Sequence, residues 1–237
     1  MPELWKKSLQ SAYVNHRIIT AVNREKQVNW LIVELGLADV ASERINKELD
    51  RMLIGFNRLC KYKSVKQASL GYFRMLDIVS GENVCHPTIH ILLPTIKSYF
   101  QGRYYIKAES WLALWCKAMD MDSTDNVTVN VKVVSAKGEQ QTVIRKMDQG
   151  LSRLVEDTGQ RRQIQNESSI HLASRRLIGY SRMMKEYMER LNPAVVVDIN
   201  QYDTEDTIAN AVFEIMLDWY PGIRHENERI HPFINGI

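Results

Sequence analysis

Two strongly apolar segments stand close together in the chain, and a short polar stretch separates them. Ser69–Val79 (SLGYFRMLDIV) and Thr88–Leu93 (TIHILL) are rich in the β-branched and aromatic residues that strands favour. Ser80–Asn83 (SGEN) between them has the composition of a turn. We therefore predict an antiparallel hairpin, whose second strand is entered through Pro87 and closed by Pro94.

Other segments alternate between strand and helix patterns along the chain. Gln27–Leu35 is a compact apolar run typical of a buried strand, and Val127–Val134 alternates as a half-buried strand does. Helices are expected where apolar residues recur every three to four positions. These helices fall at residues 39–61, 108–119, 141–157, 171–191 and 205–219, with Asp203 or Thr204 capping the last. This order predicts an α+β fold, a central mainly antiparallel sheet covered by helices, with a helical C-terminal part.

The charge of the chain is unevenly distributed. The net charge of +3 combines a basic body, residues 1–192, with an acidic segment, residues 193–237. A basic body attracts polyanions, nucleic acid above all, although many proteins carry such a bias without binding DNA. We expect residues 1–192 to form one domain and residues 193–237 to form an acidic helical extension packed on it.

The spacing of the cysteines and the lengths of the apolar stretches indicate the cellular compartment. Cys60, Cys85 and Cys116 are widely spaced, without a CxxC pair, which favours a reducing environment. The first residues lack the apolar core of a signal peptide, and no stretch approaches the roughly 18 apolar residues of a membrane span. We therefore expect a cytoplasmic protein with no membrane partner.

Four short motifs occur in a fixed order between residues 28 and 192. They are GYFRMLDI at residues 71–78, CHPTIHILL at 85–93, SYF…YI…E-x-W…L-W-x-K-A at 98–118, and RRLIGY at 175–180 followed by Lys185-Glu186. In these motifs the chain resembles the rolling-circle replication initiators of small Gram-positive-type plasmids, the Rep proteins of the HUH endonuclease superfamily. The resemblance implies an antiparallel sheet that carries a DNA-processing site.

The resemblance also implies a metal-dependent DNA nicking and joining enzyme. In the family, two histidines on one strand and a carboxylate on its neighbour hold a metal ion, and a helical tyrosine attacks the phosphate. Here Thr88 replaces the first histidine, His90 is the second, and the carboxylate falls on Asp77. The tyrosine position falls near Met147, and residues 135–165 contain no tyrosine. Both differences weaken the same activity, so loss of nicking is expected, although enzymatic activity stays open.

A residual metal site is a second possibility that the sequence leaves open. Its ligands would be Asp77, His90 and His86, but about 13 Å of extended strand separates the two histidines. Only a bulge or a turn at Pro87 would bring them to one metal ion. We expect no resident cofactor, with Mg²⁺ or Mn²⁺ only if such a site survives. Otherwise His90 is structural and His86 is solvated.

Lys97–Lys107 (KSYFQGRYYIK) interleaves cations with aromatic rings. Single-stranded DNA-binding proteins use this composition, because cations meet phosphates while rings stack on bases. The DNA contacts expected in this segment and on the basic helix at 171–191 are Lys97, Tyr99, Phe100, Arg103, Tyr104, Lys107, Arg175 and Arg176. The alternatives are a loop anchored to the core by its aromatic residues and a solvated basic helix face.

Our main hypothesis is a DNA-binding protein related to rolling-circle initiators, acting in plasmid replication or its control without nicking. Its partner would be single-stranded or origin-like DNA. One alternative is an active nickase with a rearranged site, in which Tyr104 or Tyr105 attacks. Another is a protein-interaction adaptor, in which the acidic segment occupies or mimics the DNA groove. The oligomeric state is left open.

Overall fold

The computed structural model describes residues 2–80, 83–136, 140–156, 177–191, 200 and 202–219. Its strands are β1 (Val28–Leu37), β2 (Val40–Ala41), β3 (Phe73–Ser80), β4 (Val84–Ile96), β5 (Val127–Val133) and β6 (Ile178–Tyr180). Its α-helices are α1 (Pro2–Glu25), α2 (Ile45–Leu59), α3 (Lys63–Ala68), α4 (Ala108–Ala118), α5 (Gln140–Glu156), α7 (Arg182–Leu191) and α8 (Thr207–Asp218). Two 3-10 helices, η1 (Ser42–Arg44) and η2 (Gly102–Tyr104), complete the order. None of the described helices is long and apolar enough to cross a membrane.

The chain divides into two compact units. The helical unit consists of residues 1–22, 135–165 and 188–237, and the sheet unit of residues 23–134 and 166–187. The C-terminal helix α8 therefore belongs with α1 and α5, two elements from the earlier part of the chain. The expected division into residues 1–192 and 193–237 stays a prediction.

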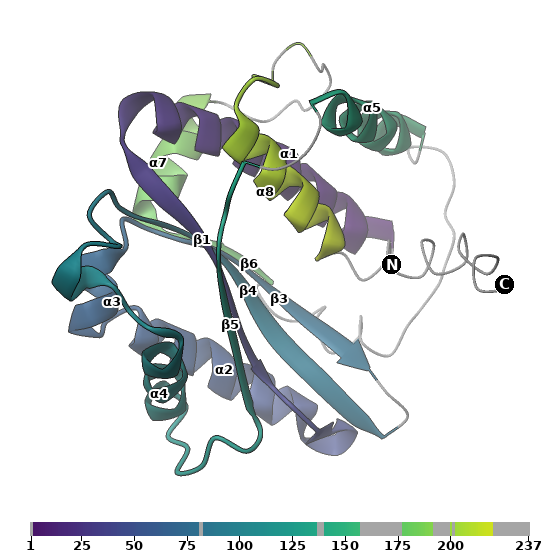
Figure 1. Ribbon diagram of the computed structural model, residues 1–237. Coiled ribbons are helices and arrows are strands. Elements are labelled where there is room, and N and C mark those ends of the chain that lie inside the picture. The colour runs from purple at the N-terminus through teal and green to yellow at the C-terminus, as the bar shows by residue number, and fades with distance from the viewer. Residues whose placement is uncertain are drawn as a thin grey trace, which may run out of the picture. The chain divides into compact units, whose positions relative to one another are not determined.

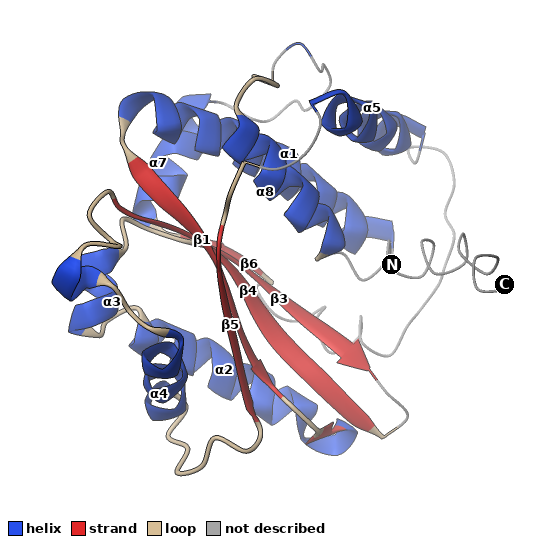
Figure 2. Ribbon diagram, in the orientation of Figure 1, coloured by secondary structure: helices blue, strands red, loops and turns tan. Residues whose placement is uncertain are grey.

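The described strands of the sheet unit form one antiparallel sheet in the order β5-β1-β4-β3-β6, with β2 pairing beside β1 on β4 (Figures 1 and 2). This confirms the predicted α+β fold with a mainly antiparallel sheet. The longest strand, β4, lies in the middle, and its residues 89–95 are buried without interruption.

β3 and β4 form the predicted hairpin, but β4 is longer than expected. It runs through Pro87 and Pro94 instead of beginning and ending at them. At each proline, β4 has no paired residue on one of its two sides. In the pairing register, β3 begins at Phe73, two residues short of Pro94, and the β1–β4 pairing ends at Gly36, one residue short of Pro87. A missing N–H is tolerated at both places for this reason.

α2 and α4 pack together on one face of the sheet, α2 against β4 and α4 against β5. The guanidinium of Arg74 on β3 lies over the Phe56 ring of α2, at 5.7 Å from its centroid, which fixes that face. Side chains that share the face with Arg74 are apolar and buried: Leu31, Val33, Leu35, Leu76, Ile78, Ile89 and Ile91. With the two buried tryptophans of α4, they form the core of the sheet unit.

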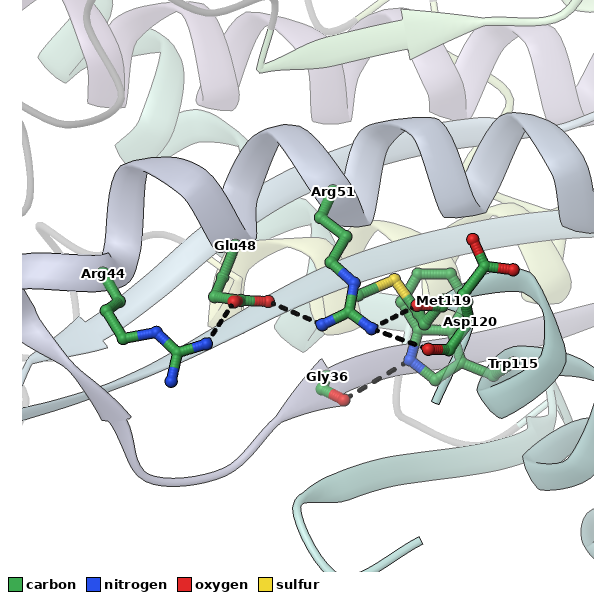
Figure 3. Close-up of polar contacts among 7 residues, drawn as sticks. All are labelled: Gly36, Arg44, Glu48, Arg51, Trp115, Met119 and Asp120. Carbon is green, nitrogen blue, oxygen red and sulfur yellow. Dashed lines mark hydrogen bonds and ion pairs between the residues drawn. The ribbon is translucent and has the colours of Figure 1, made fainter. Parts of the chain in front are cut away.

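A polar network joins α2 to the end of α4 (Figure 3). Buried Glu48 accepts hydrogen bonds from Arg44 at 3.2 Å and from Arg51 at 3.3 Å. Arg51 also donates to the carbonyl oxygens of Met119 and Asp120, which follow the last turn of α4. These carbonyls lack partners within the helix, so Arg51 caps the C-terminus of α4.

The helical unit is held by contacts among α1, α5 and α8. The buried Tyr13 ring of α1 lies 4.9 Å from the Phe213 ring of α8, and its hydroxyl donates to the Met147 carbonyl of α5. Lys146 of α5 forms a 2.6 Å ion pair with Glu214 of α8. Each pair of helices therefore shares a specific contact, in addition to apolar burial.

Two expectations about the later helices are wrong. A single helix was expected at residues 171–191, but residues 178–180 form strand β6, which pairs with β3, before α7 begins. Ile-Gly-Tyr suits a strand, and the open edge of β3 offers hydrogen-bond partners that override the helical pattern. Residues 171–176 lie outside the described part of the chain.

The second error concerns the cap of α8. Neither Asp203 nor Thr204 caps this helix, because it begins two residues later than expected. Asp206 is the N-cap, and its carboxylate accepts from the N–H groups of Ile208 at 3.1 Å and Ala209 at 2.9 Å. An aspartate in this position satisfies two of the orphan donors at a helix N-terminus.

Candidate functional site

Polar side chains from four adjacent strands meet on the face of the sheet opposite to α2 and α4. Thr88 and His90 point to this face together, because residues two apart on a strand share a face. The register places Asp77 of β3 opposite Thr88 and Glu34 of β1 opposite His90, and Asn130 of β5 pairs with Glu34. We call Asp77, His90, Glu34 and Asn130 the polar row.

The members of the polar row are in contact with one another. His90 Nδ1 lies 3.3 Å from Glu34 Oε1, and His90 Nε2 lies 3.7 Å from Asp77 Oδ2. Asn130 Nδ2 donates to the second oxygen of Glu34 at 2.8 Å. The side chains of His90 and Asp77 are only 5% and 4% exposed, whereas that of Glu34 is 30% exposed. One imidazole is therefore enclosed between two carboxylates.

The electrostatics of the row follow from this enclosure. The contact with His90, helped by Asn130, lowers the pKa of Glu34 to about 2, although partial burial opposes the change. Burial alone would lower the pKa of His90, but its contacts with Asp77 and Glu34 together outweigh burial and raise that pKa. The row thus has a carboxylate on each side of a buried imidazole, an arrangement that favours the protonated ring.

The predicted metal ligands are only partly brought together. Asp77 and His90 are neighbours, but His86 lies four residues from His90 on a continuous strand, and its Nδ1 accepts a hydrogen bond from the Asp39 N–H at 3.3 Å. Within the described residues, no group of three or more histidine, cysteine, aspartate or glutamate side chains is arranged to hold a metal ion. Both nitrogens of His90 face carboxylates, so the residues present do not fit the metal centre that the resemblance implies.

Thr88, which replaces the first histidine, stands beside a glycine that gives it room. A Cβ atom on Gly36 would lie 2.4 Å from the Thr128 hydroxyl oxygen and 3.1 Å from that of Thr88. Both hydroxyls therefore lean over the same backbone position. From the other face, Trp115 Nε1 donates to the Gly36 carbonyl at 3.4 Å (Figure 3), so α4 supports this part of β1.

The position expected for a nucleophile lies in the helical unit. Met147 is fully buried on α5, and its carbonyl accepts from Tyr13. α5, which spans Gln140–Glu156, contains no tyrosine. Met147 is therefore a core residue of its own unit.

The loop between β4 and α4 presents a mixed surface of cations and rings. Tyr99 is buried, and its hydroxyl donates to the Ile106 carbonyl at 3.3 Å, so its ring anchors the loop and is not exposed for DNA contact. Phe100 and Tyr105 are 46% and 48% exposed. The guanidinium of Arg103 lies 4.9 Å from the centroid of the Tyr104 ring and donates to its hydroxyl. Lys97 and Lys107 are exposed at the two ends of the loop.

Two further expectations concern arginines and alternative nucleophiles. Arg175 and Arg176 lie outside the described residues. β4 ends at Ile96, six residues and roughly 20 Å along the strand from His90. Tyr104 and Tyr105 lie in the loop beyond that end. The structure does not bring these tyrosines to the polar row, and this separation gives no support to a rearranged nickase.

Sequence reasoning missed Glu34, the residue that encloses His90 from the second side. The available signal was a lone carboxylate within the apolar run of β1 (VNWLIVELGL), at a position where burial calls for a partner. The partner could not be named, because the register between β1 and β4 is a long-range property.

Comparison with known proteins gives matches along most of the chain. A family model described as "Replication protein" matches residues 3–228. A "Protein rep" of Bacillus amyloliquefaciens is 35% identical, over 93% of this chain and 72% of the relative. A "Protein rep" of a Bacillus species is 33% identical, over 79% and 68%, and a "Replication protein" of Staphylococcus aureus is 26% identical, over 75% and 80%. The similarity therefore includes both units.

Proposed function

The chain belongs to the replication-protein family of plasmid replication initiators, and on this premise we propose that it binds DNA without nicking it. It would act at or near a plasmid origin, in replication or in its control. The exposed cations and rings of the β4–α4 loop support DNA binding, with Lys97, Phe100, Arg103, Tyr104 and Lys107 as the proposed contacts.

The arrangement of the polar row is the main observation that supports the proposed loss of nicking. A metal ion would have to displace Asp77 or Glu34 from His90 before it could bind the imidazole, and Thr88 offers a poor ligand in exchange. Met147 cannot attack a phosphate. Metal and nucleophile act as a unit in this chemistry, so the loss of either removes most of the rate.

The test is denaturing electrophoresis of the full chain after incubation with labelled, origin-like single-stranded oligonucleotides and Mg²⁺ or Mn²⁺. We expect no covalent protein–DNA adduct and no cleaved product. A slowly migrating band that carries a phosphotyrosine link would overturn the proposal and establish the nickase alternative. A protein that binds neither single-stranded nor duplex DNA would favour the adaptor.

A substitution series separates the two defects. Thr88→His restores the missing imidazole opposite Asp77, so we expect measurable Mn²⁺ binding, stronger when Glu34→Gln also frees His90. Thr88→Ala, the matched control, should bind no metal. None of these variants should cleave DNA, because no tyrosine stands at the position of Met147.

A further inference from the structure

Two stretches of the sheet unit contain basic residues but no aspartate or glutamate. They are residues 51–76 and 83–108, which include the first half of β3 and all of β4. Their exposed cations near α3 and η2 are Lys61, Lys63, Lys66, Lys97, Arg103 and Lys107. We call these six residues the basic surface.

The fold brings the two stretches side by side. α3 lies against η2, as Figure 1 also shows. Just after α3, Ser69 forms a β-bridge with Thr95, and the Leu70 N–H donates to the Pro94 carbonyl at 2.8 Å. Lysines on and before α3 therefore continue the row of cations that begins in the β4–α4 loop.

The cations of the basic surface differ from the nearby arginines in their ion pairing. Arg44, just before the neighbouring helix α2, and Arg51 on it share Glu48, and Arg58 of α2 pairs with Asp120. In the part of the chain that the structure describes, no carboxylate forms an ion pair with any of the six cations of the basic surface. A compact group of unpaired cations attracts a polyanion.

Exposed rings within the basic surface indicate which polyanion it suits. Phe100 and Tyr105 have ring centroids 5.9 Å apart, and both rings contact Tyr99, which is buried beneath them. The buried Tyr99 ring therefore supports the two exposed rings from beneath. Flat rings beside cations suit unpaired bases, which a duplex does not expose.

We propose that α3 and the β4–α4 loop form one surface for single-stranded DNA. In it, Lys61, Lys63 and Lys66 contact phosphates, while Phe100 and Tyr105 stack on bases. The inference rests on the proposed DNA-binding function and adds to it a second element, α3, whose lysines extend the contact surface beyond the loop.

The test is fluorescence anisotropy of the full chain with a labelled single-stranded oligonucleotide across a range of salt concentrations. Lys63→Ala/Lys66→Ala should reduce the slope of log K against log salt by about 1.4, which corresponds to roughly 25-fold weaker binding at 0.1 M salt. Lys47→Ala/Lys132→Ala removes the same charge from exposed positions in the first turn of α2 and on β5, away from α3 and the β4–α4 loop, and should leave binding unchanged. Phe100→Ala should weaken binding at least about fivefold without changing the slope.

The outcomes distinguish this inference from the function beneath it. If the chain binds single-stranded DNA but both lysine pairs have equal effects, α3 takes no part and the inference fails while DNA binding stands. Binding of duplex DNA alone also overturns the inference and leaves the function intact. Binding of no DNA at all overturns both.

Discussion

His16 in the helical unit and His90 in the sheet unit are both buried, but in surroundings of different charge. His16 donates from Nε2 to Asn210 Oδ1 at 2.9 Å and lies beside the rings of Tyr202 and Phe213. His90 lies between the carboxylates of Asp77 and Glu34.

The difference in surroundings reverses the effect on ionisation. Burial lowers the pKa of His16, and Asn210 with the more distant Asp206 and Asp203 does not compensate. The carboxylates around His90 overcome a similar burial and raise its pKa. Similar burial thus accompanies opposite pKa shifts in the two histidines, and the neighbouring groups decide the direction.

The largest effect that tests this comparison is on stability at neutral pH. His90→Leu leaves two carboxylates facing each other without a cation, which should cost on the order of 3–5 kcal/mol of unfolding free energy. His16→Leu leaves only the Asn210 oxygen without its donor and should cost about 1–3 kcal/mol. Urea unfolding measures both. Adding Glu34→Gln to His90→Leu should recover part of the loss, and equal costs for the two leucine variants would refute the assigned charges.

The next effect is the pH dependence of stability, which should differ in sign. The folded state of His16 binds its proton less readily than the unfolded chain, so its contribution is lost as pH falls below about 6.5. His90 has a raised pKa when folded, so its contribution is complete below about 6.5 and is lost as pH rises through the folded value.

Urea unfolding between pH 5 and pH 9 checks these signs. His16→Leu should flatten the loss on the acid side, and His90→Leu the loss on the alkaline side, each by at most about 1.4 kcal/mol per pH unit. The contribution of Glu34, whose pKa is lowered to about 2, is lost only as pH falls from its ordinary value near 4.5 and does not enter this window. Parallel pH profiles for the two variants would contradict the comparison.

The smallest effect concerns the outer end of the polar row. Asn130→Ala removes the 2.8 Å hydrogen bond to the partly exposed Glu34, so we expect a loss of about 1 kcal/mol. The pKa of Glu34 should rise from about 2, since Asn130 helps to lower it. Carboxyl titration by NMR measures this change, and an unchanged Glu34 would mean that His90 alone determines its ionisation.

Local patterns predicted most of the sheet, and the family resemblance named Asp77 and His90, half of the polar row. Strict alternation located β5, and the spacing of Thr88 and His90 placed both on one face. Asp77 was named from the family resemblance, and the register of β3 and β4 brings its carboxylate to 3.7 Å from His90. The position of Glu34 required the pairing of β1 with β4, which are far apart in the sequence and joined by no turn.

Three other features were also not predicted from the sequence, one because of its local pattern and two because they depend on tertiary contacts. The sequence analysis did not predict α1, because its buried polar residues, Asn15 and His16 among them, interrupt the apolar stripe that marks a helix. Tyr99 was taken for a possible DNA contact, since its burial depends on how the loop folds back on Ile106. Strand β6 was taken for helix because its pairing with β3 is a tertiary contact.

The two prolines within β4 have a consequence for how the chain finds its fold. A slip of β4 by one residue would turn its apolar face to the wrong side, but a slip by two would preserve every face. A two-residue slip in one direction would put Pro94 where Leu92 now pairs with Phe73, and in the other it would put Pro87 where Ile89 pairs with Leu35. Each proline would then stand where the ladder needs an N–H. The prolines therefore disfavour two-residue slips of β4 during folding, which the hydrophobic pattern alone would allow.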